Sequence, residues 1–266
     1  MTKNVYSLIK GSLPILISMP HNGTEIPESI AETMTEDALK MVDTDWYLDK
    51  LYDFAVNEGA WIINPKYSRY VIDLNRPKDN ETLYPGQDTT ELCPTTTFDK
   101  KPIYKLQKPS NKEIKERVIN YWQPYHSEVK RCLDLMKKEY GIALLFEAHS
   151  IKSEVPRFFE GKLTDFNFGN YNQLSCSEEL TELLDDWQPK GYSKVINGRF
   201  KGGYLTRQYG DPKNGIHSLQ LELSQGTYMD ELELTYNESK AKQVKVELQS
   251  LFNCFKVFVS LVEPKK

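Results

Sequence analysis

The sequence predicts an α/β fold, with a mixed, largely parallel sheet covered by helices on both faces. Short aliphatic runs bounded by glycine or polar residues alternate along the chain with segments whose apolar positions have helical spacing. The connections between the aliphatic runs are long enough for the helical crossovers that parallel strands need. The 266 residues contain no internal repeat and no linker-like change of composition, so we expect a single domain over residues 1–266.

The first part of the chain alternates strand-like and helix-like segments. The run LPILISMP is short and aliphatic and ends at His21, as a buried strand followed by a loop does. After this strand at 13–20 we expect helices at 28–41 and 44–58 and strands at 61–65 and 68–75. Residues 76–110 are rich in Pro, Thr, Asp and Lys and form a long irregular segment, which inside a compact domain is usually functional.

The second part of the chain contains the strongest helix signal, at residues 111–139. Ser110 and Asn111 supply caps, an apolar stripe recurs at helical spacing, and Gly141 ends the helix. The remaining expected elements are a buried strand at 142–150, a polar and aromatic loop at 151–175, a helix near 177–187, a strand at 217–225 and a closing helix at 238–262.

Composition argues against two classes of partner, nucleic acid and membranes. The formal net charge is −4 and no block of like charges resembles a nucleic-acid-binding surface. No stretch approaches the ~18 apolar residues of a membrane span, and no export signal is present. The four cysteines are scattered, so we expect reduced thiols that act as small core hydrophobes in a cytoplasmic protein.

Two histidines share one placement in the predicted sheet. His21 and His149 each follow an apolar strand directly, whereas His217 opens a strand. Because the carboxyl ends of adjacent parallel strands meet at one edge of a sheet, His21 and His149 are expected to lie close together. Neutral imidazole is a common zinc ligand, and a catalytic zinc takes three protein ligands. The sequence therefore predicts a divalent metal site, and for the third ligand it leaves four carboxylates open: Glu25, Asp43, Asp45 and Glu147.

A base and several cations complete the candidate site. Glu222 alternates with apolar neighbours near the end of a strand, where an ionised carboxylate is costly unless it has a function or a partner. We interpret Glu222 as the general base. Planar guanidinium groups bind carboxylates, and glycines permit close approach of the backbone. The candidate substrate-binding residues either follow a predicted strand or lie in and around a glycine pair. They are Asn75, Arg76, Arg199, Lys201, Gly202, Gly203 and Arg207.

Eight stretches of the chain, several of which contain these candidate residues, together resemble the N-formylglutamate amidohydrolase (N-formylglutamate deformylase) family. The matching segments are ISMPHNGTEIP, DTDWYLDKLYDF, YSRYVIDLNRP, YWQPYHSEV, LLFEAHSI, LTDFNFGNYN, NGRFKGGYLTRQYG and LQLELSQGTYM. The resemblance implies hydrolysis of N-formyl-L-glutamate to formate and L-glutamate, the last step of one histidine-degradation route. It also implies a fold similar to zinc carboxypeptidases, of the phosphorylase/hydrolase-like type.

The similarity to zinc carboxypeptidases implies roles for the candidate residues. It implies His21 and His149 as metal ligands, the pair Asn75 and Arg76 as the grip on a substrate carboxylate, and Glu222 as the catalytic residue. The carboxypeptidase pattern has its metal Glu three residues after the first His, where this chain has Thr24 and where Glu25 is one residue late. We prefer Asp45 as the third ligand, because its stretch DTDW belongs to the deformylase pattern. His126 lies on the long helix in the stretch YWQPYHSEV, and either reaches the site or packs among its aromatic neighbours.

These residues suggest a mechanism and two competing hypotheses. A metal ion, Zn²⁺, lowers the pKa of its water, Glu222 accepts the proton, and the two basic segments around Arg76 and at 199–207 hold a substrate with two carboxylates. The first competing hypothesis is a metal-dependent amidohydrolase for another N-acyl amino acid or a short peptide. The second is a non-catalytic protein that binds an acidic metabolite. A serine hydrolase is disfavoured, because the chain has no G-x-S-x-G motif.

Overall fold

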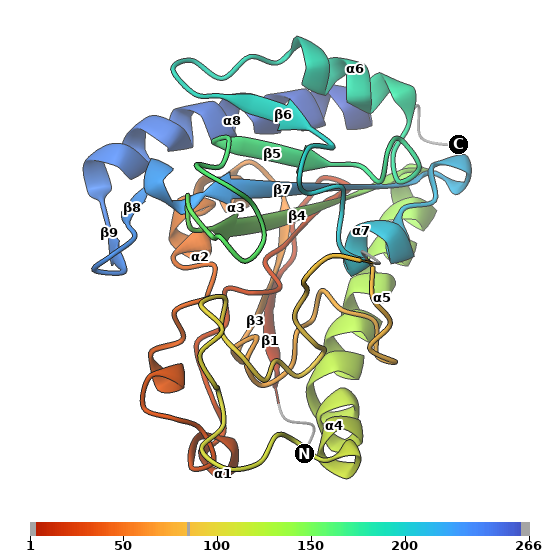
Figure 1. Ribbon diagram of the computed structural model, residues 1–266. Coiled ribbons are helices and arrows are strands. Elements are labelled where there is room, and N and C mark those ends of the chain that lie inside the picture. Colours follow the sequence, from red (N-terminus) through yellow and green to blue (C-terminus); the bar gives the residue numbers. More distant parts are fainter. Residues whose placement is uncertain (1–3, 84–85, 262–266) are drawn as a thin grey trace.

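A seven-stranded sheet crosses the protein in the computed structural model, which describes residues 4–83 and 86–261 (Figure 1). The strand order is β1-β3-β2-β4-β7-β5-β6. The strands are β1 (Tyr6–Ile9), β2 (Ile15–Ser18), β3 (Trp61–Pro65), β4 (Ala143–Ile151), β5 (Phe166–Gly169), β6 (Lys194–Ile196) and β7 (Ile216–Ser224). Neighbours among β3, β2, β4 and β7 pair in parallel, whereas β1 and β5 pair antiparallel with β3 and β7. The prediction of a mixed, largely parallel sheet is confirmed.

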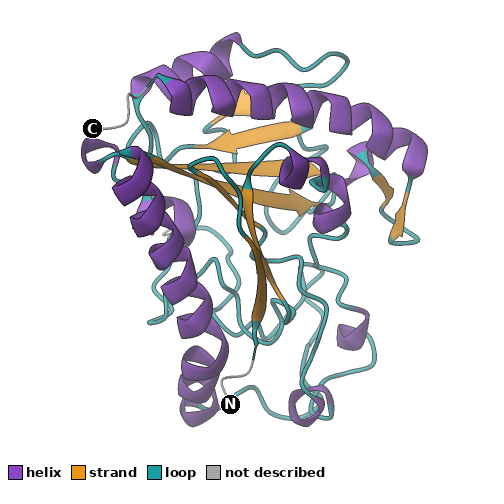
Figure 2. Cartoon of the chain, turned by 180° about the vertical axis from the view of Figure 1, so that it is seen from behind, coloured by secondary structure: helices purple, strands orange, loops and turns teal. Residues whose placement is uncertain are grey.

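Helices cover both faces of this sheet, as predicted (Figures 1 and 2). Helix α5 packs on one face, and α8 with α6 covers the other. The helices are α1 (Glu28–Ala31), α2 (Leu48–Leu51), α3 (Phe54–Asn57), α4 (Asn111–Arg117), α5 (Gln123–Tyr140), α6 (Glu178–Asp186), α7 (Tyr204–Tyr209) and α8 (Glu238–Ser260). Short helical turns are Ala38–Lys40, Pro212–Asn214 and Gln225–Thr227, and a small hairpin joins β8 (Met229–Asp230) to β9 (Thr235–Tyr236).

Strand β4 shows why the central strands are apolar on both sides. Leu144 and Phe146 belong to the core under α8, where the rings of Phe146 and Phe255 are 4.8 Å apart. Leu145 points the other way and belongs to the core under α5. Because side chains alternate along a strand, His149 lies on the same face as Leu145 and the α5 core. Near its carboxyl end, this buried strand thus carries a polar residue on the α5 face.

The long elements predicted from periodicity are confirmed within a few residues. The strands predicted at 13–20, 61–65, 142–150 and 217–225 are β2, β3, β4 and β7, and the helices at 177–187 and 238–262 are α6 and α8. The helix predicted at 111–139 is formed by α4 and α5 with a π-helical turn between them, Val118–Trp122. Ser110 and Glu113 form a capping box at its start, and Gly141, with φ of 79°, ends it.

Three predictions of local structure are wrong. Residues 68–75 are a series of turns rather than a strand, because their polar side chains bond locally, as Arg69 does to Asp73 at 2.8 Å. The helices predicted at 28–41 and 44–58 are broken into short pieces, and Met41 and Tyr47 interrupt them with φ values of 49° and 61°. The loop predicted at 151–175 contains β5, whose four residues are too few to show a period.

Other expectations concern cysteines, membranes and the irregular segment. All four cysteines are free, and Cys93, Cys132 and Cys176 are buried. Within the described residues no helix is long and apolar enough to span a bilayer. The described part of 76–110 contains no helix and no strand beyond isolated bridges, as expected.

His217 stabilises the fold at the start of β7. Its Nδ1 accepts a hydrogen bond from the backbone N–H of Ser177 at 3.1 Å, at the beginning of α6, and its ring packs edge-on against Phe258 at 4.8 Å. Burial lowers the pKa of His217 to about 4. The ring is therefore neutral in the folded protein, because a proton on Nδ1 would remove the acceptor for Ser177.

We expect this histidine to make the folded protein sensitive to acid. Because the folded pKa of about 4 lies below the unfolded pKa of about 6.5, the unfolded chain binds the proton first as the pH falls. The stabilisation is present above pH 6.5 and is lost as the pH falls toward the folded pKa. Between pH 7 and pH 5, the free energy of unfolding measured with urea should fall by about 2 kcal/mol more in the wild-type chain than in His217→Gln. Equal losses in the two proteins would contradict a neutral, buried His217.

Candidate active site

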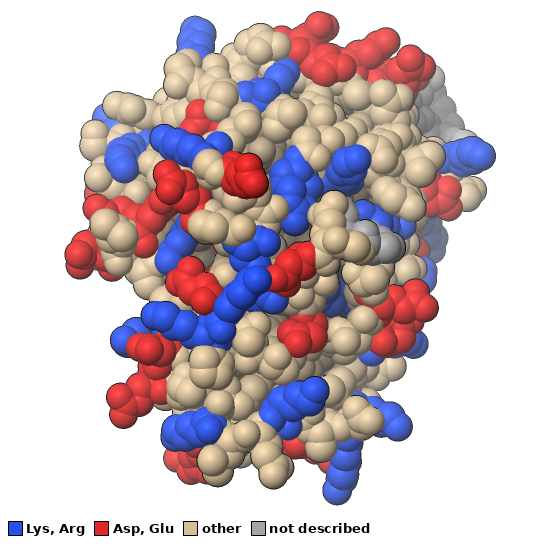
Figure 3. Space-filling model, in the orientation of Figure 1, with Lys and Arg blue, Asp and Glu red and all other residues tan. Residues whose placement is uncertain are grey.

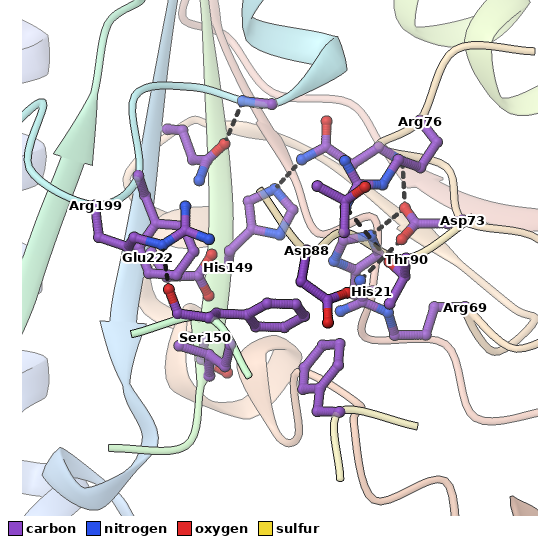
Figure 4. A pocket seen from close by; sticks show the side chains of 18 residues that line it. His21, Arg69, Asp73, Arg76, Asp88, Thr90, His149, Ser150, Arg199 and Glu222 are labelled. Carbon is purple, nitrogen blue, oxygen red and sulfur yellow. Dashed lines mark hydrogen bonds and ion pairs between the residues drawn. The ribbon is translucent and has the colours of Figure 1, made fainter. Parts of the chain in front are cut away.

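A small pocket opens at the carboxyl ends of β2, β4 and β7 (Figure 4). Its cavity of about 90 Å³ is far below the ~300–1,000 Å³ of sites for drug-sized ligands, so it suits a small molecule. The wall combines histidines, carboxylates, three arginines and several aromatic rings. The lining residues are His21, Arg69, Asp73, Asn75, Arg76, Asp88, Thr89, Thr90, Phe98, His149, Ser150, Ile151, Phe158, Arg199, Phe200, Gly203, Gln220 and Glu222.

Two histidines of the pocket wall converge on a buried aspartate, which is not itself among the lining residues. One ligand atom from each of His21, Asp45 and His149 lies within 4.8 Å of the others, and all three residues are buried. Oδ2 of Asp45 is 3.1 Å from Nδ1 of His149 and 3.6 Å from Nδ1 of His21. Backbone contacts hold the aspartate there, because the N–H of Ser150 donates to the same oxygen at 3.1 Å. Two imidazoles and one carboxylate are a common ligand set of catalytic zinc.

The outer nitrogen of His21 is fixed by a second carboxylate. Its Nε2 is 2.7 Å from Oδ1 of Asp73, and the other oxygen of Asp73 accepts from Nη2 of Arg69 at 2.8 Å. In metal sites a carboxylate on the far nitrogen orients the imidazole and leaves the near nitrogen free to bind. The contact with Asp73 therefore turns Nδ1 of His21 toward Asp45, and the three residues fit a bound divalent cation.

The charges around the cluster also favour a cation. Burial raises the pKa of Asp45, but the nearby imidazoles of His21 and His149 outweigh it and hold that pKa well below the usual range. For His149, burial lowers the pKa, yet the nearby carboxylates of Asp45, Glu147 and Glu222 raise it to about 10. A buried carboxylate that stays ionised between two imidazoles is suited to holding a metal ion.

Glu222 lies beside the cluster on the neighbouring strand. It pairs directly with His149 in the parallel register of β4 and β7, and it lines the pocket. Burial raises the pKa of Glu222 to about 8, although His149 acts in the opposite direction. A carboxyl group with a pKa near neutrality is able both to accept and to return a proton at working pH.

The other carboxylates considered as third ligand lie elsewhere. Oδ2 of Asp43 accepts from the hydroxyl of Tyr70 at 2.7 Å and from the N–H of Phe98 at 2.9 Å. Glu25 is exposed and pairs with Lys66 at 3.2 Å. Glu147 is buried next to His149, but it approaches Nε2, the nitrogen on the far side of the ring from Asp45. Among the four carboxylates, Asp45 is the one that joins the two histidines.

Comparison with known proteins shows the family of this chain. A sequence model described as N-formylglutamate amidohydrolase matches residues 13–229. The N-formylglutamate deformylase of Pseudomonas putida is 47% identical over 251 residues, which cover 93% of this chain and 94% of that protein. The enzyme of the same name from Pseudomonas aeruginosa is 46% identical over 230 residues, or 85% of this chain and 86% of the relative. This chain belongs to the N-formylglutamate amidohydrolase family.

Solved structures support the fold of this family member. The crystal structure of N-formylglutamate amidohydrolase from Ralstonia eutropha matches with a TM-score of 0.80 and 25% identity, and the match covers 95% of this chain and 98% of that one. A gene product from Agrobacterium tumefaciens matches with a TM-score of 0.74 at 15% identity, over 97% and 96% of the two chains. At 15% identity, the second match supports only the assignment of the fold.

In this family member the predicted substrate residues lie in two groups. Asn75, Arg76, Arg199 and Gly203 line the pocket, and Arg76 and Arg199 lie on opposite sides of His149 in Figure 4. Arg207 is not among the lining residues, because its guanidinium donates to the backbone carbonyls of two neighbouring segments, at Leu83 and Gly202.

The glycine pair fits close packing of side chains rather than a phosphate. A Cβ on Gly203 would lie 2.3 Å from Nδ2 of Asn75, so a side chain there would displace the amide. Oδ1 of Asn75 accepts from the N–H of Leu205 at 2.9 Å, at the start of α7. Asn75 thus joins the pocket wall to α7.

Sequence reasoning missed Arg69 and Asp73, and left His126 open. Arg69 and Asp73 lie in the segment that was predicted as a strand, where their i, i+4 contact could not be foreseen. His126 stacks on Trp122, with ring centroids 3.7 Å apart, and its Nε2 donates to the carbonyl of Leu74 at 2.9 Å. It is not among the pocket-lining residues, so it holds the backbone next to Asn75 from behind.

The geometry of the cluster predicts that zinc affinity depends on Asp45 far more than on the nearby Asp43. Asp45→Asn should weaken binding of zinc by more than about 100-fold, beyond the usual effect of changing a residue outside the ligand set. Asp43→Asn is the matched control, because Asp43 is also buried but bonds to Tyr70 and Phe98. Zinc affinity is measured by competition with a chromophoric chelator. Equal affinities of the two variants would exclude Asp45 as a ligand.

Proposed function

We propose that this chain is a metal-dependent deformylase that hydrolyses N-formyl-L-glutamate to formate and L-glutamate. The observation that carries the proposal is a buried carboxyl group, Glu222, on the strand next to a buried His-Asp-His cluster. Relatives named N-formylglutamate deformylase at 46–47% identity support the substrate. We propose the corresponding role in the breakdown of histidine, in the cytoplasm.

His21, Asp45 and His149 would hold the ion, for which Zn²⁺ suits the ligand set best. When bound, the ion supplies a Lewis acid that polarises the formyl oxygen and lowers the pKa of the attacking water. The alternative ligands Asp43, Glu25 and Glu147 have other partners, which supports Asp45 as the third ligand.

Glu222 is the residue that moves the proton in this proposal. Its carboxylate takes one proton from the water whose oxygen attacks the formyl carbon. The C–N bond then breaks, and Glu222 delivers the proton to the departing amine of glutamate. A pKa of about 8 for Glu222, raised by burial, suits both transfers.

Arginines on the pocket wall account for a substrate with two carboxylates. We assign one carboxylate to Arg76 with Asn75 and the other to Arg199, because these side chains reach the pocket from different segments. Arg207 supports the turn at Gly202 from outside. Lys and Arg side chains also gather around the middle of the face shown in Figure 3, with acidic residues among them, which favours approach of an anion.

Formate release tests the proposal directly. The purified wild-type chain should contain close to one zinc per chain and release formate from N-formyl-L-glutamate, and a chelator should abolish the release until zinc is restored. Glu222→Gln should keep its zinc and lose about 10²–10⁴-fold in turnover, since a neutral amide cannot accept the proton of the attacking water. Glu247→Gln is the control, because Glu247 is a buried glutamate on α8, away from the pocket-lining residues.

Each outcome has a distinct meaning. Zinc without formate release, in a protein that cleaves N-acetyl or N-succinyl glutamate instead, would replace the formyl substrate by another acyl group. Near-normal turnover of Glu222→Gln would remove Glu222 from the role of base. A protein that binds no divalent ion and shows no turnover would overturn the proposed function.

A further inference from the structure

Glu147 is a fully buried carboxyl group that the proposed reaction does not use. It lies on β4, two residues before His149, on the face covered by α5. Its Oε1 accepts from the hydroxyl of Ser218 at 3.0 Å. Its Oε2 is buried and has no hydrogen-bond partner within the described residues. An unsatisfied carboxylate oxygen in the interior costs free energy, so its position calls for an explanation.

The nearest group that could satisfy this oxygen is the outer nitrogen of His149. Nε2 of His149 is 3.8 Å from Oε2 of Glu147, and the other ring nitrogen, Nδ1, faces Asp45 at 3.1 Å. Glu147 and Asp45 therefore lie on opposite sides of one imidazole. His21 has the same arrangement, in which Asp73 already contacts Nε2 at 2.7 Å.

The side chain of Asn75 also contacts Nε2 of His149, but its amide donates a hydrogen bond where a carboxylate would accept one. Nδ2 of Asn75 is 3.1 Å from Nε2 of His149. Because Oδ1 of Asn75 accepts from the N–H of Leu205, the amide is oriented with its donor toward the histidine. An N–H donor bonds to Nε2 only while that nitrogen carries no proton.

A metal ion reverses this requirement. An imidazole that offers the lone pair of Nδ1 to a metal carries its proton on Nε2, and that N–H needs an acceptor. The N–H of Asn75 cannot accept it. Oε2 of Glu147 is a buried carboxylate oxygen with an open position, and a shift of less than 1 Å brings it to the ~2.9 Å of a hydrogen bond.

We propose that Glu147 is a positioning residue, whose Oε2 accepts the Nε2–H of His149 and fixes Nδ1 toward the metal. The inference rests on the metal site of the proposed function. It has a consequence for Asn75, because its amide N–H is then released from His149 and faces the pocket that it lines. Metal binding thus prepares the pocket wall for a substrate carboxylate.

Zinc affinity separates this role from simple packing. Glu147→Met keeps the approximate volume and removes the acceptor, whereas Glu147→Gln keeps an acceptor oxygen and removes the charge. We expect Glu147→Met to weaken zinc binding 10–100-fold and Glu147→Gln to recover most of it, measured by chelator competition without substrate. Glu247→Gln, a buried glutamate that accepts from the N–H of Lys190, is the matched control and should bind zinc like the wild type.

A second readout does not depend on the folding of Glu147→Met. In zinc-loaded wild-type protein with ¹⁵N-labelled histidine, Nε2 of His149 should be protonated, and its proton resonance should move upfield in Glu147→Gln, where the acceptor is neutral. An unprotonated Nε2, a resonance that Glu147→Gln leaves unchanged, or wild-type zinc affinity in Glu147→Met would overturn the proposal. A wild-type chain that binds no zinc would instead overturn the metal site itself.

Discussion

The contact of Asp45 with two imidazoles, out of reach of bulk water, is the interaction on which the site depends. A buried carboxylate is costly unless positive charge and hydrogen bonds compensate it. Here the chain compensates it with His21 and His149 and with the N–H of Ser150. The backbone on both sides of Asp45 is also held, because Gln225 donates to the carbonyl of residue 44 at 3.0 Å and Tyr228 donates to that of residue 46 at 2.8 Å.

The sheet brings the partners of Asp45 together. Strand β4 lies between β2 and β7, and all three run parallel, so residues that follow β2 and end β4 and β7 meet at one edge. Side-chain alternation then decides the face, because a slip of one residue in β4 would turn His149 into the core under α8. Such a slip is disfavoured, because it would bury the polar side chains of Glu147 and His149 in the apolar core under α8. The site is therefore held by the same packing that stabilises the sheet.

Sequence periodicity could predict the part of the site that follows from this sheet. His21, His149 and Glu222 stand at the ends of aliphatic runs, and the structure brings them together. The third carboxylate could not be chosen from the residues alone, because Asp43 and Asp45 are neighbours in one loop and both are buried. Left-handed backbone at Met41 and Tyr47 shapes that loop, and no periodic pattern encodes it.

Hydrogen bonds of polar side chains and of the backbone explain the other differences. Residues 68–75 contain a short apolar run like that of a strand, yet the contact between Arg69 and Asp73 and the bond from the N–H of Asp73 to the carbonyl of Leu92 fold them into turns. Arg199 and Arg207 are close in sequence on either side of the glycine pair, but Arg199 reaches the pocket and Arg207 bonds to the backbone outside it.

The central claim is that His21, Asp45 and His149 together hold one divalent cation. Crystals grown with zinc and measured on both sides of the zinc absorption edge test it most directly. We predict one strong anomalous peak per chain, within bonding distance of Nδ1 of His21, Oδ2 of Asp45 and Nδ1 of His149. A peak bound to Glu147 or Asp43 instead would contradict the account. So would zinc that fully occupies another site while this cluster shows no peak.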